Sequence, residues 1–139
     1  SGNLKFSNDM TIISDFAFAD CVSLNSVTIP GSIYSINHGA FQNCCNLTNV
    51  AIFDGVCSIG ICAFQNCSNL IYITIPESVN SIGAEAFSGC SSLISITIPY
   101  AVTTIERQTF YNCSSLTNII IPASVTSIGY RAFQDCSSL

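Results

Sequence analysis

Hydrophobic side chains return at the same positions every 23 residues along the chain. Three positions of the repeat show this period directly. They hold cysteine (Cys21, Cys44, Cys67, Cys90, Cys113, Cys136), leucine (Leu24, Leu47, Leu70, Leu93, Leu116, Leu139) and phenylalanine (Phe18, Phe41, Phe64, Phe87, Phe110, Phe133). A fixed period of 20 to 50 residues is typical of solenoid proteins. The pattern therefore predicts a stack of similar coils.

Within each repeat, alternation of apolar and polar residues predicts one short β-strand. In the repeat that begins at Cys90, Ile96 and Ile98 alternate with Ser95 and Thr97. A period of two with β-branched residues indicates a strand that has one buried face. A proline follows and ends the strand, because proline cannot donate to a sheet ladder. The same position holds Pro30, Pro76, Pro99 and Pro122, and Phe53 replaces proline in one copy.

The second half of each repeat predicts a return segment and a turn. Val102 and Ile105 are expected to point inward from an extended segment, and a glycine after it permits the chain to turn. Gly60, Gly83 and Gly129 hold this position, which Asn37 and Glu106 fill in other copies. The next residues, "AEAF" at 84–87 or "YRAF" at 130–133, predict a single helical or 3₁₀ turn that buries alanine and phenylalanine.

One repeat cannot bury its own apolar face, so each coil must pack against its neighbours. The phenylalanines are then expected to form a continuous spine, and successive strands to lie about 4.7–4.9 Å apart in one parallel sheet. We expect an α/β repeat solenoid: one domain at residues 4–139 with about six 23-residue repeats, truncated at both ends. Residues 1–3 are interpreted as a remnant of cloning and a ragged start. Because neither end shows a polar cap, the terminal repeats are expected to fray or to associate end to end with another molecule.

The repeat "IPxSVxxIGxxAFxxCSSL" resembles the BspA-type leucine-rich repeats, and the resemblance extends from about Leu4 to Leu139. The first copy departs from the pattern, since Ser7 stands in the proline position. The resemblance implies a right-handed superhelix with the parallel sheet on its concave face. It also implies a non-enzymatic surface or secreted module that takes part in adhesion to host or microbial proteins or glycans.

Composition and charge exclude several classes of function. Charged residues make up only 8% of the chain and the net charge is −5. The three cations, Lys5, Arg107 and Arg131, do not cluster. Binding to nucleic acid requires several cations that neutralise phosphates, and binding to an anionic membrane has the same requirement. No apolar run approaches the ~20 residues of a membrane helix, so membrane insertion by this fragment is not expected.

Nine cysteines raise the question of disulfides, metal or redox chemistry. Equivalent residues of stacked coils have parallel Cβ vectors, which disfavours a disulfide between them. We therefore expect the six repeating cysteines to be reduced, buried thiols. A bridge between Cys57 and Cys62 is the best alternative. The spacing of Cys44, Cys45, Cys57 and Cys62 does not match that of zinc sites, so neither a metal nor a cofactor is expected.

Other reactive residues do not form a recognisable catalytic set. His38 is the only histidine and stands at a variable position, where we expect it to face solvent. Asp54, Glu77 and Glu85 are expected to be solvated turn residues. Acid–base or nucleophilic catalysis needs converging partners that this pattern does not supply. Three glycosylation sequons begin at Asn46, Asn66 and Asn112, but asparagine also simply recurs before the cysteine.

The outward strand positions form the candidate binding face, since solenoids use such surfaces for recognition. The residues predicted to bind are Asn49, Tyr72, Thr74, Ser95, Thr97, Asn118 and Ile120. Tyr72 and Ile120 interrupt the small polar pattern, and aromatic residues are favoured as binding anchors. The alternative interpretation is a soluble sheet surface without a ligand. In that case the chain would be a structural spacer that presents another domain.

Overall fold

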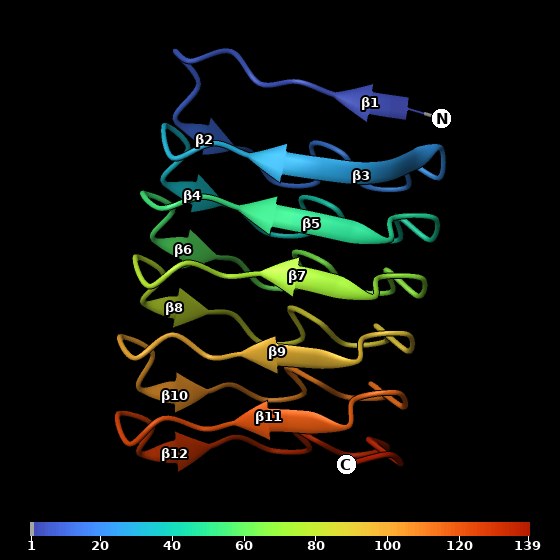
Figure 1. The fold of residues 1–139 in the computed structure, drawn as a ribbon, viewed down its shortest axis with the longest axis vertical. Helices are drawn as coiled ribbons and strands as arrows, with labels where there is room; N and C mark the ends of the chain where they lie inside the picture. Colours follow the sequence, from blue (N-terminus) through green and yellow to red (C-terminus); the bar gives the residue numbers. More distant parts are fainter. Residues whose placement is uncertain (1) are drawn as a thin grey trace.

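The computed structural model describes residues 2–139, in which similar coils are stacked in a single column (Figure 1). Ser1, part of the segment interpreted as a cloning remnant, lies outside the described residues. A short first coil (residues 2–20) precedes five coils of 23 residues: coil 2 (21–43), coil 3 (44–66), coil 4 (67–89), coil 5 (90–112) and coil 6 (113–135).

Each coil contributes one longer and one shorter strand. The longer strands are β1 (Gly2–Leu4), β3 (Leu24–Ile29), β5 (Asn49–Ile52), β7 (Tyr72–Thr74), β9 (Ser95–Thr97) and β11 (Asn118–Ile120). The shorter strands are β2 (Ile12–Ile13), β4 (Ser35–Ile36), β6 (Ser58–Ile59), β8 (Ser81–Ile82), β10 (Thr104–Ile105) and β12 (Ser127–Ile128). The predicted return segment is thus itself a strand.

Pairing is parallel and keeps the 23-residue register. Val27 of β3 pairs with Val50 of β5, and Ile59 of β6 pairs with Ile82 of β8. The prediction of a single parallel sheet was therefore incomplete, because the shorter strands form a second parallel ladder on another side of the column. It was missed because two-residue strands are too short to show alternation in the sequence.

The phenylalanine spine is confirmed. Consecutive rings from Phe18 to Phe133 stack with centroids 5.3 to 5.7 Å apart and interplanar angles of 2 to 14°. Phe41, Phe64, Phe87 and Phe110 are fully buried, together with the repeating leucines and cysteines of the same coils. Phe6 contacts Phe18 edge-on at the start of the spine. One continuous core therefore runs the length of the column.

The predicted helical or 3₁₀ turn is wrong, since no residue between 2 and 139 is helical. Two residues of every turn have a left-handed backbone, for example Gly39 and Asn43 with φ of 61° and 60°. A helix needs consecutive right-handed residues, so these two positions prevent it. The second position is Asp20, Asn43, Asn66, Gly89, Asn112 and Asp135, the residue types that tolerate this conformation. Asn66 and Asn112, which begin two of the three sequons, thus recur for a conformational reason.

Every second N–H group of the turn points toward the next coil. The N–H groups of Gly39, Phe41 and Asn43 each donate to a carbonyl of coil 3 at 2.8 Å. The same three bonds recur at every later interface between coils 3 and 6. A third ladder of hydrogen bonds, here called the turn ladder, therefore joins the coils along the side of the column that the turns form.

The repeating cysteines are hydrogen-bonded thiols. The Sγ of Cys67 donates to the carbonyl oxygen of Phe41 at 3.2 Å. Four other repeating cysteines make the equivalent bond to the phenylalanine 26 residues earlier: Cys44, Cys90, Cys113 and Cys136. All nine cysteines are free, including Cys57 and Cys62. Burial raises the pKa of the Cys113 thiol to about 12 and raises that of Cys90 as well. These thiols are therefore held in the protonated form, which is the inert one.

Both strand ladders are interrupted at the same interface, between coil 4 and coil 5. Across the described residues, β7 does not pair with β9, and β8 does not pair with β10. The turn ladder remains intact there, with Phe87 N–H bonded to Thr109 O at 2.9 Å. We call this interface the seam. Strand pairing therefore divides the column into a four-coil stack and a two-coil stack. The two stacks remain joined by the turn ladder, by the Phe87 and Phe110 rings at 5.7 Å, and by a bond from Ile94 N–H to Ile71 O at 3.4 Å.

Glu106 accounts for the opening on the short-strand side. It occupies the glycine position, where a Cβ at Gly83 would lie 2.5 Å from the nitrogen of Ile61 in the coil before. Gly60, Gly83 and Gly129 each donate to the preceding coil at 2.7 to 2.8 Å, whereas Glu106 makes no such bond. Asn37, which also replaces the glycine, keeps its bond to Ile13 at 2.9 Å.

Candidate functional site

The outward residues of the longer strands form one continuous surface, here called the long-strand face. Val27, Val50, Ile73 and Ile96 point into the core, so the intervening residues point outward. The predicted binding residues Asn49, Tyr72, Thr74, Ser95, Thr97, Asn118 and Ile120 are all exposed on it. The structure therefore places all seven on the same side of the column.

The seam divides these seven residues into two groups. Asn49 lies directly beside Tyr72, with Thr74 further along the same strand. Ser95 lies beside Asn118, and Thr97 beside Ile120. The side chain of Tyr72 is 57% exposed and that of Ile120 is 71% exposed. The face thus has one exposed apolar side chain on each side of the seam, and the residues around both are mainly serine, threonine and asparagine.

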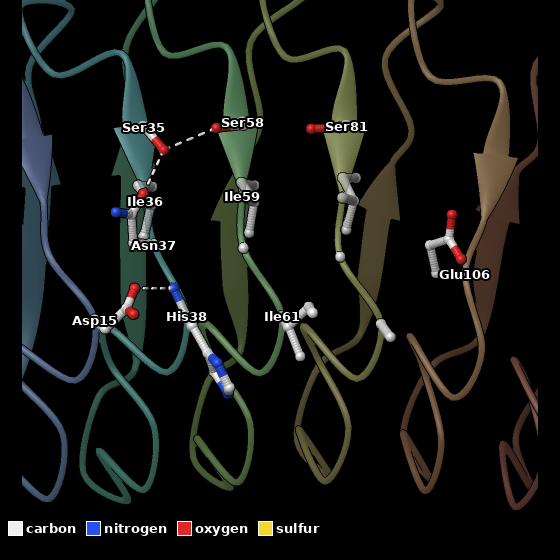
Figure 2. A pocket seen from close by; sticks show the side chains of 14 residues that line it. Asp15, Ser35, Ile36, Asn37, His38, Ser58, Ile59, Ile61, Ser81 and Glu106 are labelled. Carbon is white, nitrogen blue, oxygen red and sulfur yellow. Dashed lines mark hydrogen bonds between the residues drawn. The ribbon is translucent and has the colours of Figure 1, made fainter.

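A second surface, which the sequence did not reveal, crosses the shorter strands. It is a groove of about 500 Å³ that runs along the column from coil 1 to coil 5 (Figure 2). Gly60 and Gly83 form part of its floor because they lack side chains, and the serines that precede Ile36, Ile59 and Ile82 line it. In the sequence, the glycine position that Gly60 and Gly83 occupy was interpreted only as a turn signal. A glycine repeated at this position in neighbouring coils also predicts a strip of exposed backbone without side chains.

The groove is lined by serines, glycine backbone and isoleucines, and it carries a carboxylate at each end. Its serines form a short chain: Ser58 Oγ donates to Ser35 Oγ at 2.9 Å, and Ser35 donates to Asn37 Oδ1 at 2.6 Å. At one end, Asp15 Oδ1 accepts from the backbone N–H of His38 at 3.2 Å. At the other end stands Glu106, and no hydrogen bond or ion pair joins its carboxylate to the described residues.

His38 lies exposed on the rim of the groove, as predicted from its variable position. Its ring packs against Phe16 with centroids 4.8 Å apart, and Ile61 follows in the next coil. Among the described residues, no carboxylate side chain is hydrogen-bonded to its ring; Asp15 instead accepts from its backbone N–H. The rim is therefore a small apolar strip beside the row of serines.

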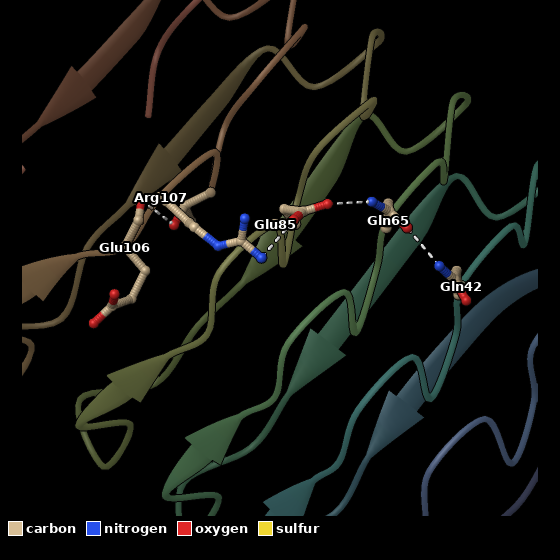
Figure 3. A network of polar contacts seen from close by, with 6 residues as sticks. Gln42, Gln65, Glu85, Glu106 and Arg107 are labelled. Atoms are coloured by element: carbon tan, nitrogen blue, oxygen red, sulfur yellow. Dashed lines mark hydrogen bonds and ion pairs between the residues drawn. The ribbon is translucent and has the colours of Figure 1, made fainter. Parts of the chain in front are cut away.

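A polar ladder on the turn side links four coils (Figure 3). Gln42 donates to Gln65, Gln65 donates to Glu85 at 2.9 Å, and Glu85 pairs with Arg107 at 3.3 Å. The prediction that Glu85 is merely a solvated turn residue was thus wrong, since its side chain is only 22% exposed. The Arg107 side chain is 61% exposed, so this pair adds at most about 1 kcal/mol. The ladder crosses the seam and reinforces its closed side.

The described residues hold no cluster of side chains suited to a metal ion. Between residues 2 and 139, no three His, Cys, Asp or Glu side chains converge as they would around a metal ion. Nor does that part of the chain contain a helix with the length and apolarity needed to span a bilayer. What the geometry offers is two extended surfaces with hydrogen-bonding groups at regular spacing, which suits binding.

Comparison with known proteins assigns these features to a family. The sequence profile described as the BspA type leucine rich repeat region matches residues 3–139 in six copies. Among curated proteins, none matches the chain.

Solved structures of bacterial repeat proteins have the same fold. A leucine-rich repeat protein from Eubacterium ventriosum superimposes with a TM-score of 0.89 at 29% identity, over 99% of this chain and 37% of that one. One from Bacteroides ovatus gives 0.80 at 31% identity, over 97% and 40%. A leucine rich cell surface protein from Faecalibacterium prausnitzii gives 0.66 at 34% identity, over 93% and 41%. The chain thus spans about two fifths of the length of these three proteins.

Proposed function

The chain belongs to the BspA-type leucine-rich repeat family, and on that premise we propose that it is a non-enzymatic binding module of a cell-surface or secreted protein. It binds a protein or glycan of a host or of another microbe through the long-strand face. The neighbour from Faecalibacterium prausnitzii is itself called a cell surface protein, which supports this placement.

One observation carries the choice of surface. Tyr72 and Ile120 are the most exposed apolar side chains on the long-strand face, and they are surrounded there by small polar residues. A large aromatic side chain loses solvent contact and little conformational freedom on binding, which makes it a suitable anchor. The neighbouring hydroxyls and amides can then hydrogen-bond a sugar or an extended peptide. The absence of charge among them favours an uncharged or weakly charged ligand over a polyion.

The test is a screen of the chain against immobilised glycans and extracellular-matrix proteins. We expect a ligand whose binding is abolished in a double variant, Tyr72→Asp with Ile120→Asp. The matched control is Tyr100→Asp, because Tyr100 is 66% exposed but lies in the turn after Pro99, away from the face. This control should bind like the unaltered chain.

Two outcomes would contradict the proposal. The double variant could bind every captured ligand as well as the control does, or the unaltered chain could capture none. The second result would instead favour the alternative of a structural spacer, whose faces need only be soluble.

A further inference from the structure

We propose that the groove across the shorter strands is a second binding site, for an extended peptide segment that carries two cationic side chains about 19 Å apart. This site lies on a different side of the column from the long-strand face. It does not depend on the function proposed above, and either could fail without the other.

The length of the ligand follows from the spacing of the coils. Asp15 belongs to coil 1 and Glu106 to coil 5, so four coil steps separate them. Each step of a parallel ladder is about 4.8 Å, which gives about 19 Å between the two ends. An extended or polyproline II segment rises about 3.1–3.3 Å per residue, so six residue steps cover this distance. The volume of about 500 Å³ falls within the range of about 300–1,000 Å³ that is typical of small-molecule pockets.

The charge of the ligand follows from the residues at the ends. The groove is lined by two carboxylates and by neither lysine nor arginine. Arg107, although adjacent in sequence to Glu106, is engaged with Glu85 on the turn side. Asp15 uses one oxygen for the His38 N–H and keeps the other free. Each end can therefore accept a guanidinium or ammonium group.

The middle of the groove can satisfy a peptide backbone. Ser58 donates to Ser35 and Ser35 to Asn37, which leaves the Asn37 amide hydrogens and the Ser81 hydroxyl available within the described residues. Gly60 and Gly83 allow the ligand backbone to approach the floor closely. The interior glycine in coils 3 and 4 and its replacement by Glu106 in coil 5 together set the length of the site.

A rigid peptide probe tests the spacing. Polyproline II has three residues per turn, so two arginines six positions apart point in the same direction and lie about 19 Å apart. The probe is a fluorescently labelled Arg-Pro₅-Arg, and its matched control is Arg-Pro₂-Arg, in which the arginines also share a direction but lie about 9 Å apart. We expect the long probe to bind threefold to fivefold more tightly, as measured by fluorescence anisotropy in low salt.

Two conservative variants locate the site. In Glu106→Gln and in Asp15→Asn, the long probe should bind no more tightly than the short one. Asp54→Asn removes one negative charge from an exposed turn outside the groove, so it should leave the preference unchanged and thereby controls for net charge. Circular dichroism should show that all three variants fold.

Three results would overturn the proposal. The two probes could bind with equal affinity to the unaltered chain, neither could bind at millimolar concentration, or the preference could persist in folded Glu106→Gln. A preference that Asp54→Asn also abolishes would point to general charge attraction rather than to the groove, and would count against the site as well.

Discussion

Removing the ring of Phe64 tests whether the phenylalanine spine holds the coils together. Phe64 is fully buried, and its ring stacks on Phe41 at 5.3 Å and on Phe87 at 5.6 Å. Truncation of a buried phenylalanine to alanine typically costs about 3–5 kcal/mol, through lost burial and the cavity that remains. In a solenoid the loss falls on the interfaces with both neighbouring coils, so Phe64→Ala should lower the free energy of unfolding by about that amount.

The matched variant is Phe133→Ala in the last coil. Phe133 is only partly buried and stacks on one ring, at 5.4 Å, so its truncation should cost roughly half as much as that of Phe64. Urea titration followed by circular dichroism in the strand region measures both losses. Equal losses for the two variants, or a loss below about 1 kcal/mol for Phe64→Ala, would refute the view that stacked rings couple the coils.

Three further predictions concern the seam, the glycine position and the buried thiols. Glu106→Gly should allow a bond from the N–H of residue 106 to the carbonyl of Ile82, equivalent to the bond from Gly83 to Ile59. Hydrogen exchange should then slow at residues 104–106, and unchanged exchange would show that Glu106 does not cause the interruption of the short-strand ladder. Gly83→Ala places a Cβ 2.5 Å from a backbone nitrogen and should destabilise the fold by about 1–3 kcal/mol, as measured by urea midpoint, whereas a neutral effect would show that the coils separate without cost. Because the pKa of Cys113 is about 12 when folded and near 8.5 when unfolded, its contribution to stability is complete below about pH 8.5 and is lost as the pH rises toward 12. The stability of Cys113→Ala should therefore fall less steeply between pH 9 and 11 than that of the unaltered chain, and parallel curves would contradict this.

The periodic features of the fold could be predicted from the sequence because stacking repeats each physical requirement. Phe64 and Cys67 recur because each must meet its own equivalent in the neighbouring coil. The turn was predicted incorrectly because the alanine and phenylalanine of "AEAF" resemble a helical turn, whereas the left-handed residue before them shows only in the backbone. Asparagine, aspartate and glycine before the cysteine were the available signal for that conformation.

The groove and the seam depend on departures from the repeat, which is why the sequence did not reveal them. Glu106 stood out only as a substitution at a turn position. Its effect became visible once the glycine of the neighbouring coil was seen to lie within contact distance of a backbone. The exposure of Tyr72, by contrast, followed directly from strand alternation, since the direction of a side chain in a strand is fixed by its parity.

The seam gives the column a preferred place to yield under mechanical load. If the ends were pulled apart along the axis, most interfaces would resist through three ladders of hydrogen bonds, whereas the interface between coils 4 and 5 lacks the pairing of both strand ladders and retains the turn ladder, the Glu85–Arg107 pair and the stacked core. Tension would therefore first separate coils 4 and 5 on the strand side, and the two stacks would rotate apart about the turn ladder. Two intact shorter stacks would remain, able to close again when the force is released.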